Sequence, residues 1–267
     1  MAEIDSSNQK NRDNITVSDG MLIPDRAEKN LFSAWRISFF GAIFLLILLP
    51  VVSPSPYLEI MRFIPDGVLR TFQVTVVSIV IALVIGLITG LGRISRNSVI
   101  NRTATVYVEV IRGIPLLVQL FYIYYALGTL VQVPRVTAAI IAMSVCYGAY
   151  MGEIFRAGIS SIPKGQMEAA LALGMTRRQA LRKVILPQTV RTILPPVGNE
   201  FIALLKDSSL VSILAVSDLL RRGREYASTS FEYFESYTVV ALVYLVITLF
   251  LSKLVAIMED RLGESGH

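Results

Sequence analysis

The sequence predicts an all-α, polytopic membrane protein with about six transmembrane helices and a cytoplasmic loop between the fourth and the fifth. Only 17% of its 267 residues are charged and 54% are hydrophobic, whereas a soluble domain carries roughly 25% charged residues. Apolar runs long enough to cross a bilayer recur along the chain. One polar, basic stretch, EAALALGMTRRQALRKVILP at residues 168–187, lies between two of these runs.

The first part of the chain is polar up to about residue 31 and then becomes apolar. Residues 1–31 have a mixed charge and little apolar periodicity, which predicts a disordered cytoplasmic tail. The first span runs from about Trp35 to Val52, and it starts too late and is too long for a signal peptide. Residues 32–64 are therefore expected to form an N-terminal transmembrane helix and the loop that follows it.

Five further spans are predicted, each longer than the roughly 17 residues that a helix needs to cross the hydrocarbon core. Gly86 and Gly90 in the second span form a small-xxx-small pattern that suits close packing between helices. No internal repeat is evident, which argues against a secondary transporter built from inverted repeats. The expected spans are 68–91, 113–131, 136–159, 193–216 and 237–258.

The distribution of arginine and lysine predicts the orientation of these spans. Basic residues concentrate after the second span and around the loop at 160–192, and such loops stay on the cytoplasmic side. Both termini are then also inside. Three arginines disagree with this orientation, because they lie between spans five and six in a loop that is expected outside. Either that loop is an exception or the count of spans is off by one. They are Arg221, Arg222 and Arg224.

Composition excludes several classes of protein. Cys146 is the only cysteine and His267 the only histidine, which leaves no thiolate or histidine metal site and no histidine general base. No P-loop or other nucleotide cradle is present, so an energy source must come from another subunit. We expect no catalytic residue, metal or cofactor, and the net charge of +5 is attributed to cytoplasmic loops rather than to nucleic-acid binding.

The loop at 163–190 is expected to contain two short helices. Glu168, Ala169 and Ala170 open a run of strong helix formers, and Gly174 permits a sharp turn. Thr176 is suited to cap a second helix, which Pro187 limits or separates from the next. On composition alone, an ordinary amphipathic surface helix explains this stretch equally well.

The order of residues in this loop resembles the EAA loop of ABC importer permeases. The matching positions are Glu168-Ala169-Ala170, then Gly174, then Val184-Ile185-Leu186-Pro187, with Val184 where the family prefers isoleucine. The resemblance implies the type I permease fold over residues 65–262. It also implies a set of residues that couple the chain to a cytoplasmic ABC ATPase: Glu168, Ala169, Ala170, Gly174, Leu186 and Pro187. That ATPase would hydrolyse ATP, and this chain itself would be no enzyme.

Other stretches resemble the polar amino-acid branch of that family, the permeases similar to those for histidine and glutamine. They are Arg70–Thr75 (RTFQVT), Val108–Gln119 (VEVIRGIPLLVQ), Tyr150–Ile159 (YMGEIFRAGI) and Lys206–Leu210 (KDSSL), with Ser208 where threonine is usual. This likeness implies an amino-acid substrate, an extracytoplasmic binding protein that delivers it, and a second permease chain, identical or homologous. It also implies the bacterial inner membrane.

Charged and polar residues deep in the spans are the candidates for a solute pathway. Lys206 and Asp207 lie about 13 residues into span five, roughly 20 Å along the helix, where ionisable groups usually face a cavity or a partner. Ser208 and Ser209 would add hydrogen bonds. An interhelical salt bridge or a break in the helix is an equal alternative. The remaining candidates are Asn199, Glu200 and Glu153.

Two ion pairs remain open as structural alternatives. Glu153 could neutralise Lys206 or contact a cationic solute, but a pair with Arg156 one turn away is at least as favoured. Glu109 and Arg112 also form an i,i+3 pair, which is read as interfacial. The competing function for the whole chain is a secondary transporter or channel in which the buried charges relay ions. Such a protein would transport without ATP and would leave the EAA-like loop unexplained.

Overall fold

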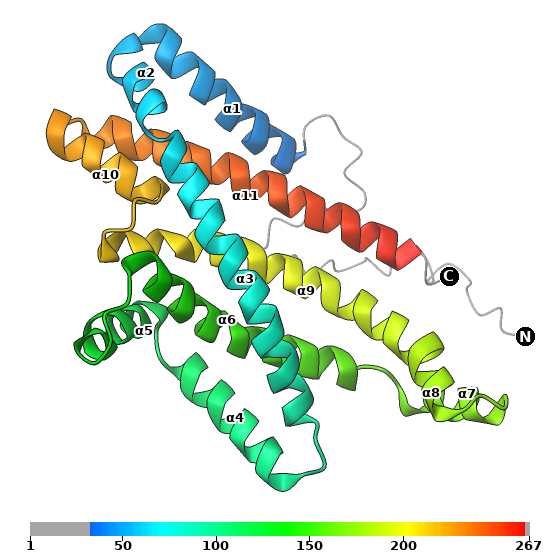
Figure 1. Ribbon diagram of the computed structural model, residues 1–267. Coiled ribbons are helices and arrows are strands. Elements are labelled where there is room, and N and C mark those ends of the chain that lie inside the picture. The colour runs from blue at the N-terminus through cyan, green and yellow to red at the C-terminus, as the bar shows by residue number, and fades with distance from the viewer. Residues whose placement is uncertain (1–32, 265–267) are drawn as a thin grey trace, which may run out of the picture.

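The computed structural model describes residues 33–264, and these residues are almost entirely helical. Figure 1 shows long helices that run side by side, with the ends of the described chain on the same side of the bundle. In chain order the elements are α1 (Ala34–Val52), α2 (Pro54–Phe63), α3 (Pro65–Arg93), α4 (Ser98–Gly113), α5 (Leu116–Phe121), η1 (Tyr122–Ala126), η2 (Leu127–Thr129), α6 (Arg135–Ser160), α7 (Lys164–Ala172), α8 (Arg177–Ala180), η3 (Leu181–Ile185), α9 (Leu186–Asp207), η4 (Ser208–Leu214), α10 (Leu219–Ser230) and α11 (Tyr233–Glu264).

Local sequence signals explain where these helices start. Asn97 accepts hydrogen bonds from the amides of Val99 and Ile100 and so caps α4. Pro115, Pro134 and Pro163 directly precede α5, α6 and α7, because a proline has no amide hydrogen to leave unpaired in a first turn. The predicted all-α fold is confirmed. The expected tail at 1–31 lies outside the described residues.

Within residues 33–264, four helical stretches are long and apolar enough to cross a membrane: Ala34–Val52, Pro54–Arg93, Arg135–Ser160 and Tyr233–Leu262. The third predicted span, 113–131, takes a different course, since α4 and the segment Leu116–Thr129 meet at 101° and pass the test only together. The backbone of Ile114 is extended, as is typical of a residue before a proline. Pro115 therefore produces the bend.

Two further segments differ from the sequence prediction. Residues 54–63, expected in a loop, form α2. The expected fifth span, 193–216, begins earlier as α9 and leaves the α-helical form at Asp207, after which η4 ends at Ala215 in the left-handed region (φ 58°). Helix α9 contains three prolines and has two ionisable residues at its end, and it is not among the four stretches that meet the apolar criterion.

The core lies where α3 crosses α6. Gly86 and Gly90 of α3 face α6 so closely that a Cβ added at either would lie within 3 Å of it. The small-xxx-small pattern therefore allows α3 and α6 to pack closely at this crossing, as the sequence predicts. Buried side chains such as Val74, Met143 and Leu204 extend this core to α9. A second cluster joins α2, α10 and α11.

The N-terminal helix α1 lies along α11 (Figure 1). The indole of Trp35 donates a hydrogen bond to the Leu249 carbonyl at 3.0 Å, and the Lys253 ammonium lies 5.6 Å from the indole ring. We call the end of the bundle with α7 and α8 the inner end, and the opposite end, with α2 and α10, the outer end.

Candidate functional site

The segment α7–η3 at the inner end forms two short helices around a glycine. Gly174 has a φ of +81°, its amide donates to the Leu171 carbonyl, and the amide of Met175 donates to the Ala170 carbonyl, at 3.0 and 3.1 Å. This is a Schellman C-cap, in which the left-handed position favours glycine. Thr176 then caps α8 in a capping box with Gln179. The expected helix, turn and helix are thus present.

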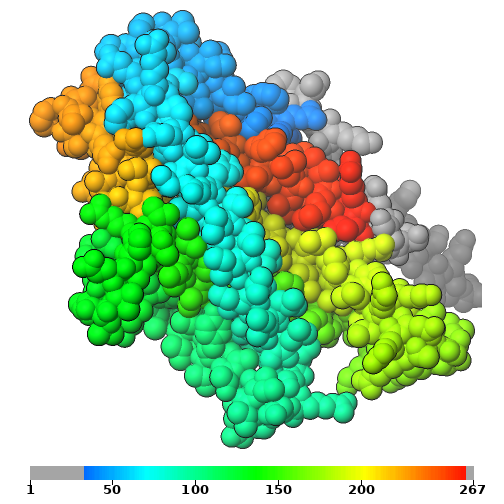
Figure 2. Space-filling view, in the orientation of Figure 1, coloured from blue at the N-terminus to red at the C-terminus, as the bar shows by residue number. Residues whose placement is uncertain are grey.

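Buried alanines hold the two short helices together, while larger apolar side chains point away from them. Ala170 and Ala180 are buried, whereas Leu173 is 81% exposed and Leu181 53% exposed. Figure 2 shows the segment as a lobe that projects from one corner of the bundle. Exposed leucines among basic residues, beyond the apolar spans, indicate a surface that contacts another protein.

The predicted coupling residues lie on both sides of this turn. Glu168, Ala169 and Gly174 are exposed, so they can contact a partner directly. Leu186 and Pro187 are exposed at the start of α9, and η3 passes into α9 without a break in the helical backbone. The end of the lobe and the start of α9 therefore form one continuous helical segment.

An ionic cluster joins α3 to α6 near the inner end. Glu153 forms ion pairs with both Arg93, which is 60 residues away in sequence, and Arg156, one turn further along α6. The predicted pair with Arg156 is thus present. The contact of Glu153 with Lys206 that the sequence left open is not among the interactions of the described residues, and Lys206 is exposed.

A cavity of about 440 Å³ opens where the bend after α4 meets α6 and the end of α9. Arg112 and Asp207 both line it. The Arg112 guanidinium lies 5.0 Å from the centre of the Tyr150 ring, and the Tyr147 hydroxyl donates a hydrogen bond of 2.7 Å to the Asp207 carboxylate. One cavity thus presents a cation and a carboxylate, which is the complement of a zwitterion. We call it the inner cavity.

Only one of the predicted pathway residues, Asp207, lines the inner cavity. Ser209 lines a separate cavity at the outer end, and the buried Ser208 hydroxyl donates to the Leu205 carbonyl at 2.7 Å. Asn199 is exposed and Glu200 is half-buried on α9. Sequence reasoning missed Arg112 as a pathway residue because Glu109 offered it a partner one turn away. The signal in the sequence that could have identified Arg112 was the Gly113-Ile114-Pro115 stretch directly after it, which predicts a break in the helix.

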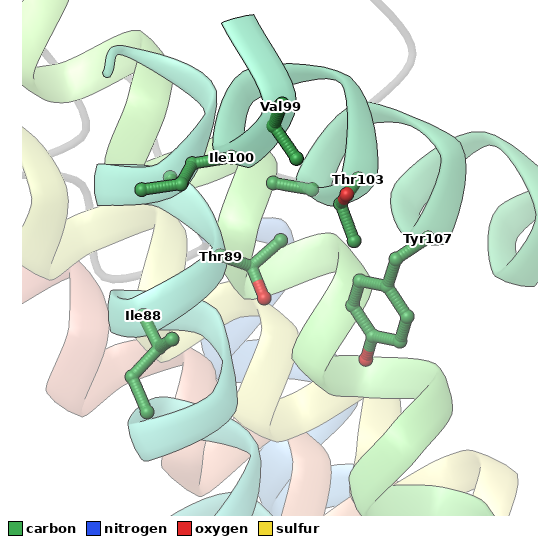
Figure 3. A pocket seen from close by; sticks show the side chains of 8 residues that line it. Ile88, Thr89, Val99, Ile100, Thr103 and Tyr107 are labelled. Carbon is green, nitrogen blue, oxygen red and sulfur yellow. The ribbon is translucent and has the colours of Figure 1, made fainter. Parts of the chain in front are cut away.

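A third cavity, of about 380 Å³, lies between α3 and α4 near the inner end. Figure 3 shows Ile88 and Thr89 on α3, and Val99, Ile100, Thr103 and Tyr107 on α4. The Tyr107 hydroxyl already donates to the Val145 carbonyl at 2.6 Å. Since the remaining lining is mainly aliphatic, this cavity offers little to a charged solute.

The fold and these surfaces define a multi-pass membrane transport protein with a projecting lobe on its inner side. Residues 82–264 match the family of binding-protein-dependent transport system inner membrane components. The chain belongs to this family, and it is a multi-pass protein of the inner membrane.

Relatives and solved structures agree with this assignment. The probable amino-acid permease protein YxeN of Bacillus subtilis is 42% identical over 73% of this chain and 88% of its own length. The glutamine transport system permease protein GlnP of Escherichia coli is 40% identical over 74% and 91%. An amino acid ABC transporter crystallised with histidines superposes with a TM-score of 0.73 at 40% identity, covering 76% of this chain and 96% of that one. The methionine ABC transporter MetNI superposes with a TM-score of 0.61 at 25% identity, covering 78% and 97%.

Proposed function

We propose that this chain is the permease subunit of an ATP-binding cassette importer that carries polar amino acids into the cell. The family assignment and the names of its relatives support an ABC importer of amino acids. The observation that carries the proposal for this chain is the inner cavity, which both Arg112 and Asp207 line. An α-amino acid has one carboxylate and one ammonium, and these two side chains complement both groups.

The energy for import comes from a separate ATPase that docks on the α7–η3 lobe. Exposed leucines would enter an apolar cleft of that ATPase, while Glu168 and Gly174 set the shape of the lobe. The unbroken passage from η3 into α9 would carry the motion of the ATPase to Asp207 at the far end of α9. ATP binding and hydrolysis would thus open the inner cavity alternately to the outside and to the inside of the membrane.

Delivery of the solute to the outer end requires an extracytoplasmic binding protein. A second permease chain, either a copy of this one or a homologue, completes the pathway. The residues proposed for the path are Arg112 and Asp207 in the inner cavity, together with Ser208, Ser209, Asn199 and Glu200 along α9 and η4; Glu153 acts with its two arginines at the inner end.

The alternative, a secondary transporter or channel, assigns the same charges to an ion relay. It gains no support from the comparisons, and it gives no role to the exposed leucines of the lobe. Transport by the reconstituted chain alone, without an ATPase, would favour this alternative over an importer.

The experiment that tests the proposal is gentle purification of the tagged chain from its native membrane, with mass spectrometry of the proteins recovered. We expect an ABC-type ATPase. The variant Leu173→Ser should lose it, whereas Leu130→Ser, in a residue equally exposed at 81% but remote from the lobe, should retain it. Retention of the ATPase by both variants would contradict docking on the lobe.

Uptake by the reconstituted complex tests the pathway separately. Asp207→Asn removes the carboxylate from the inner cavity and keeps the size of the side chain, so it should lower uptake at least tenfold without loss of the ATPase. Glu109→Gln, an exposed residue next to Arg112 along the same helix, serves as the control and should transport normally.

A further inference from the structure

Three arginines at the outer end contradict the charge pattern expected of an external loop, and the structure separates them into two kinds. Arg221 pairs with Glu225 at 2.7 Å. Arg222 pairs with Asp66 at the start of α3 and with Glu225. Both cations are neutralised by acids, and the Arg222–Asp66 pair joins α10 to α3. Arg224, by contrast, is exposed, and its side chain has no ion pair or hydrogen bond with the described residues.

Arg224 lines a cavity of about 590 Å³ between η4, α10 and α11, the largest of those described above. We call it the outer cavity. Five of its other lining residues carry hydroxyl groups, and none of its lining residues is acidic. These hydroxyl-bearing residues are Ser209, Ser212, Ser228, Tyr233 and Tyr237.

The lining therefore combines a single unpaired cation with hydroxyl groups and three aliphatic side chains, those of Leu210, Ile213 and Leu220. The Ser228 hydroxyl is engaged with the Glu225 carbonyl at 2.9 Å, whereas the side chains of Ser209 and Ser212 make no hydrogen bond with the described residues. Arginine and hydroxyl groups together complement a carboxylate, which can accept several hydrogen bonds at once. The volume lies in the usual range for pockets that take small molecules.

The outer cavity is close in sequence to the inner one. Asp207 lines the inner cavity and Ser209, two residues later, lines the outer cavity. The last residue of α9 thus lines the inner cavity, and η4, which follows directly, lines the outer cavity. The η4 segment is a 3-10 helix that ends at Ala215 in the left-handed region, a conformation that costs a non-glycine residue free energy. A strained segment between two cavities is suited to change its conformation.

We propose that the outer cavity is a second solute site, which binds the carboxylate of the amino acid through Arg224 before the solute reaches the inner cavity. This inference rests on the proposed function, because it takes the solute to be an amino acid. A small solute is favoured over an acidic loop of the binding protein because Ser212 is only 5% exposed. A donor this deep is accessible to a small molecule but not to a folded surface.

Charged thiol reagents test the site without any need for transport. In a Cys146→Ala background the chain has no other cysteine, so Ser228→Cys places a single thiol in the outer cavity, one helical turn from Arg224. The ratio of the labelling rates with an anionic and a cationic methanethiosulfonate reports the local potential. Arg224→Gln should lower this ratio about fivefold at low ionic strength, and Arg224→Lys should preserve most of it.

Thr229→Cys is the matched control, because Thr229 is exposed on the same helix but does not line the cavity. There the ratio should change by less than about twofold on the same substitution, since the charge is screened by solvent.

Protection from labelling tests ligand chemistry, with the permease alone in nanodiscs. Millimolar glycine should slow labelling of the Ser228→Cys thiol, and glycinamide, which lacks the carboxylate, should not. Equal effects of the two compounds, or protection that survives Arg224→Gln, would overturn the proposal. Protection only by the loaded binding protein would overturn it in favour of a protein contact. None of these results depends on an ATPase, so a failure of the proposed importer function would be seen separately, in the purification and uptake experiments.

Discussion

Replacement of Gly86 by alanine tests the packing that holds the bundle together. A Cβ at this position would lie 2.3 Å from the Cβ of Met151, 2.9 Å from the Met151 carbonyl carbon and 3.0 Å from the amide nitrogen of Gly152. Carbon atoms in favourable contact lie about 3.5–4.0 Å apart. Because two of the three opposing atoms belong to the backbone of α6, no side-chain rotation relieves the clash, and α3 and α6 must move apart.

The expected cost follows from this geometry. An extra methyl group in a well-packed core typically costs about 1–3 kcal/mol, and a clash with backbone belongs at the upper end. Alanine recovers up to about 1 kcal/mol in helix propensity over glycine. The net loss is then about 2 kcal/mol, which corresponds to a midpoint of thermal unfolding lower by about 4–8 °C for a chain of this size.

The assay is thermal unfolding of the purified protein in detergent, with Gly41→Ala as the control. Gly41 also lies inside a helix, but a Cβ there would meet no atom within 4 Å, so this variant should unfold at the wild-type temperature or slightly above it. A Gly86→Ala protein that unfolds together with the Gly41→Ala protein would refute the packing argument.

Three further predictions concern the lobe, the ionic cluster and the outer end. Gly174→Val forces a β-branched residue into a φ of +81°, although a Cβ there meets no atom within 4 Å. The amount of protein in the membrane should therefore stay near normal, while the strained turn should abolish ATP-linked uptake. Normal uptake by this variant would show that the lobe plays no part in the mechanism. Glu153→Gln leaves two arginines without their carboxylate and should lower the free energy of unfolding by about 1–2 kcal/mol, a value discounted for partial exposure. The control is Glu109→Gln, at an exposed position. Unfolding of both variants at the same temperature would contradict this prediction. Burial raises the pKa of Asp218, which caps α10, to about 7, against its hydrogen bonds from backbone amides. The native state then holds a proton that the unfolded chain releases above about pH 4. The free energy of unfolding should therefore fall as pH rises from about 4 to about 7 and level off above that. Asp218→Asn should show a flatter pH dependence of stability, and an equal slope in both proteins would show that Asp218 does not cause it.

Local features of the lobe could be predicted because each depends on neighbours in sequence. The Schellman cap needs a residue that tolerates a positive φ, and Gly174 supplies it. The capping box needs Thr176 and Gln179 three residues apart. Both follow from backbone conformation alone, and the apolar runs likewise predict most spans through the cost of leaving polar groups in lipid.

The pathway could be predicted only in part. Asp207 attracted attention because a carboxylate deep in a span is costly, and it does line the inner cavity. Lys206 attracted the same attention, yet it is exposed. Adjacent residues on a helix point about 100° apart, so their surroundings depend on which neighbouring helix lies on each side, and hydropathy does not encode that.

By itself, the sequence determined the helical membrane class, the position of most spans and the lobe with its glycine turn, because periodicity, capping and hydrophobicity act over a few residues. The tertiary structure alone decided that Arg112 and Asp207 line one cavity, that Glu153 has a second partner in Arg93, and that the side chain of Arg224 remains unpaired among the described residues while those of Arg221 and Arg222 do not. Each of these depends on the 101° bend after α4 or on the crossing of α3 with its neighbours. Charges distant in sequence meet only when packing brings their helices together, and packing is a property of the whole chain.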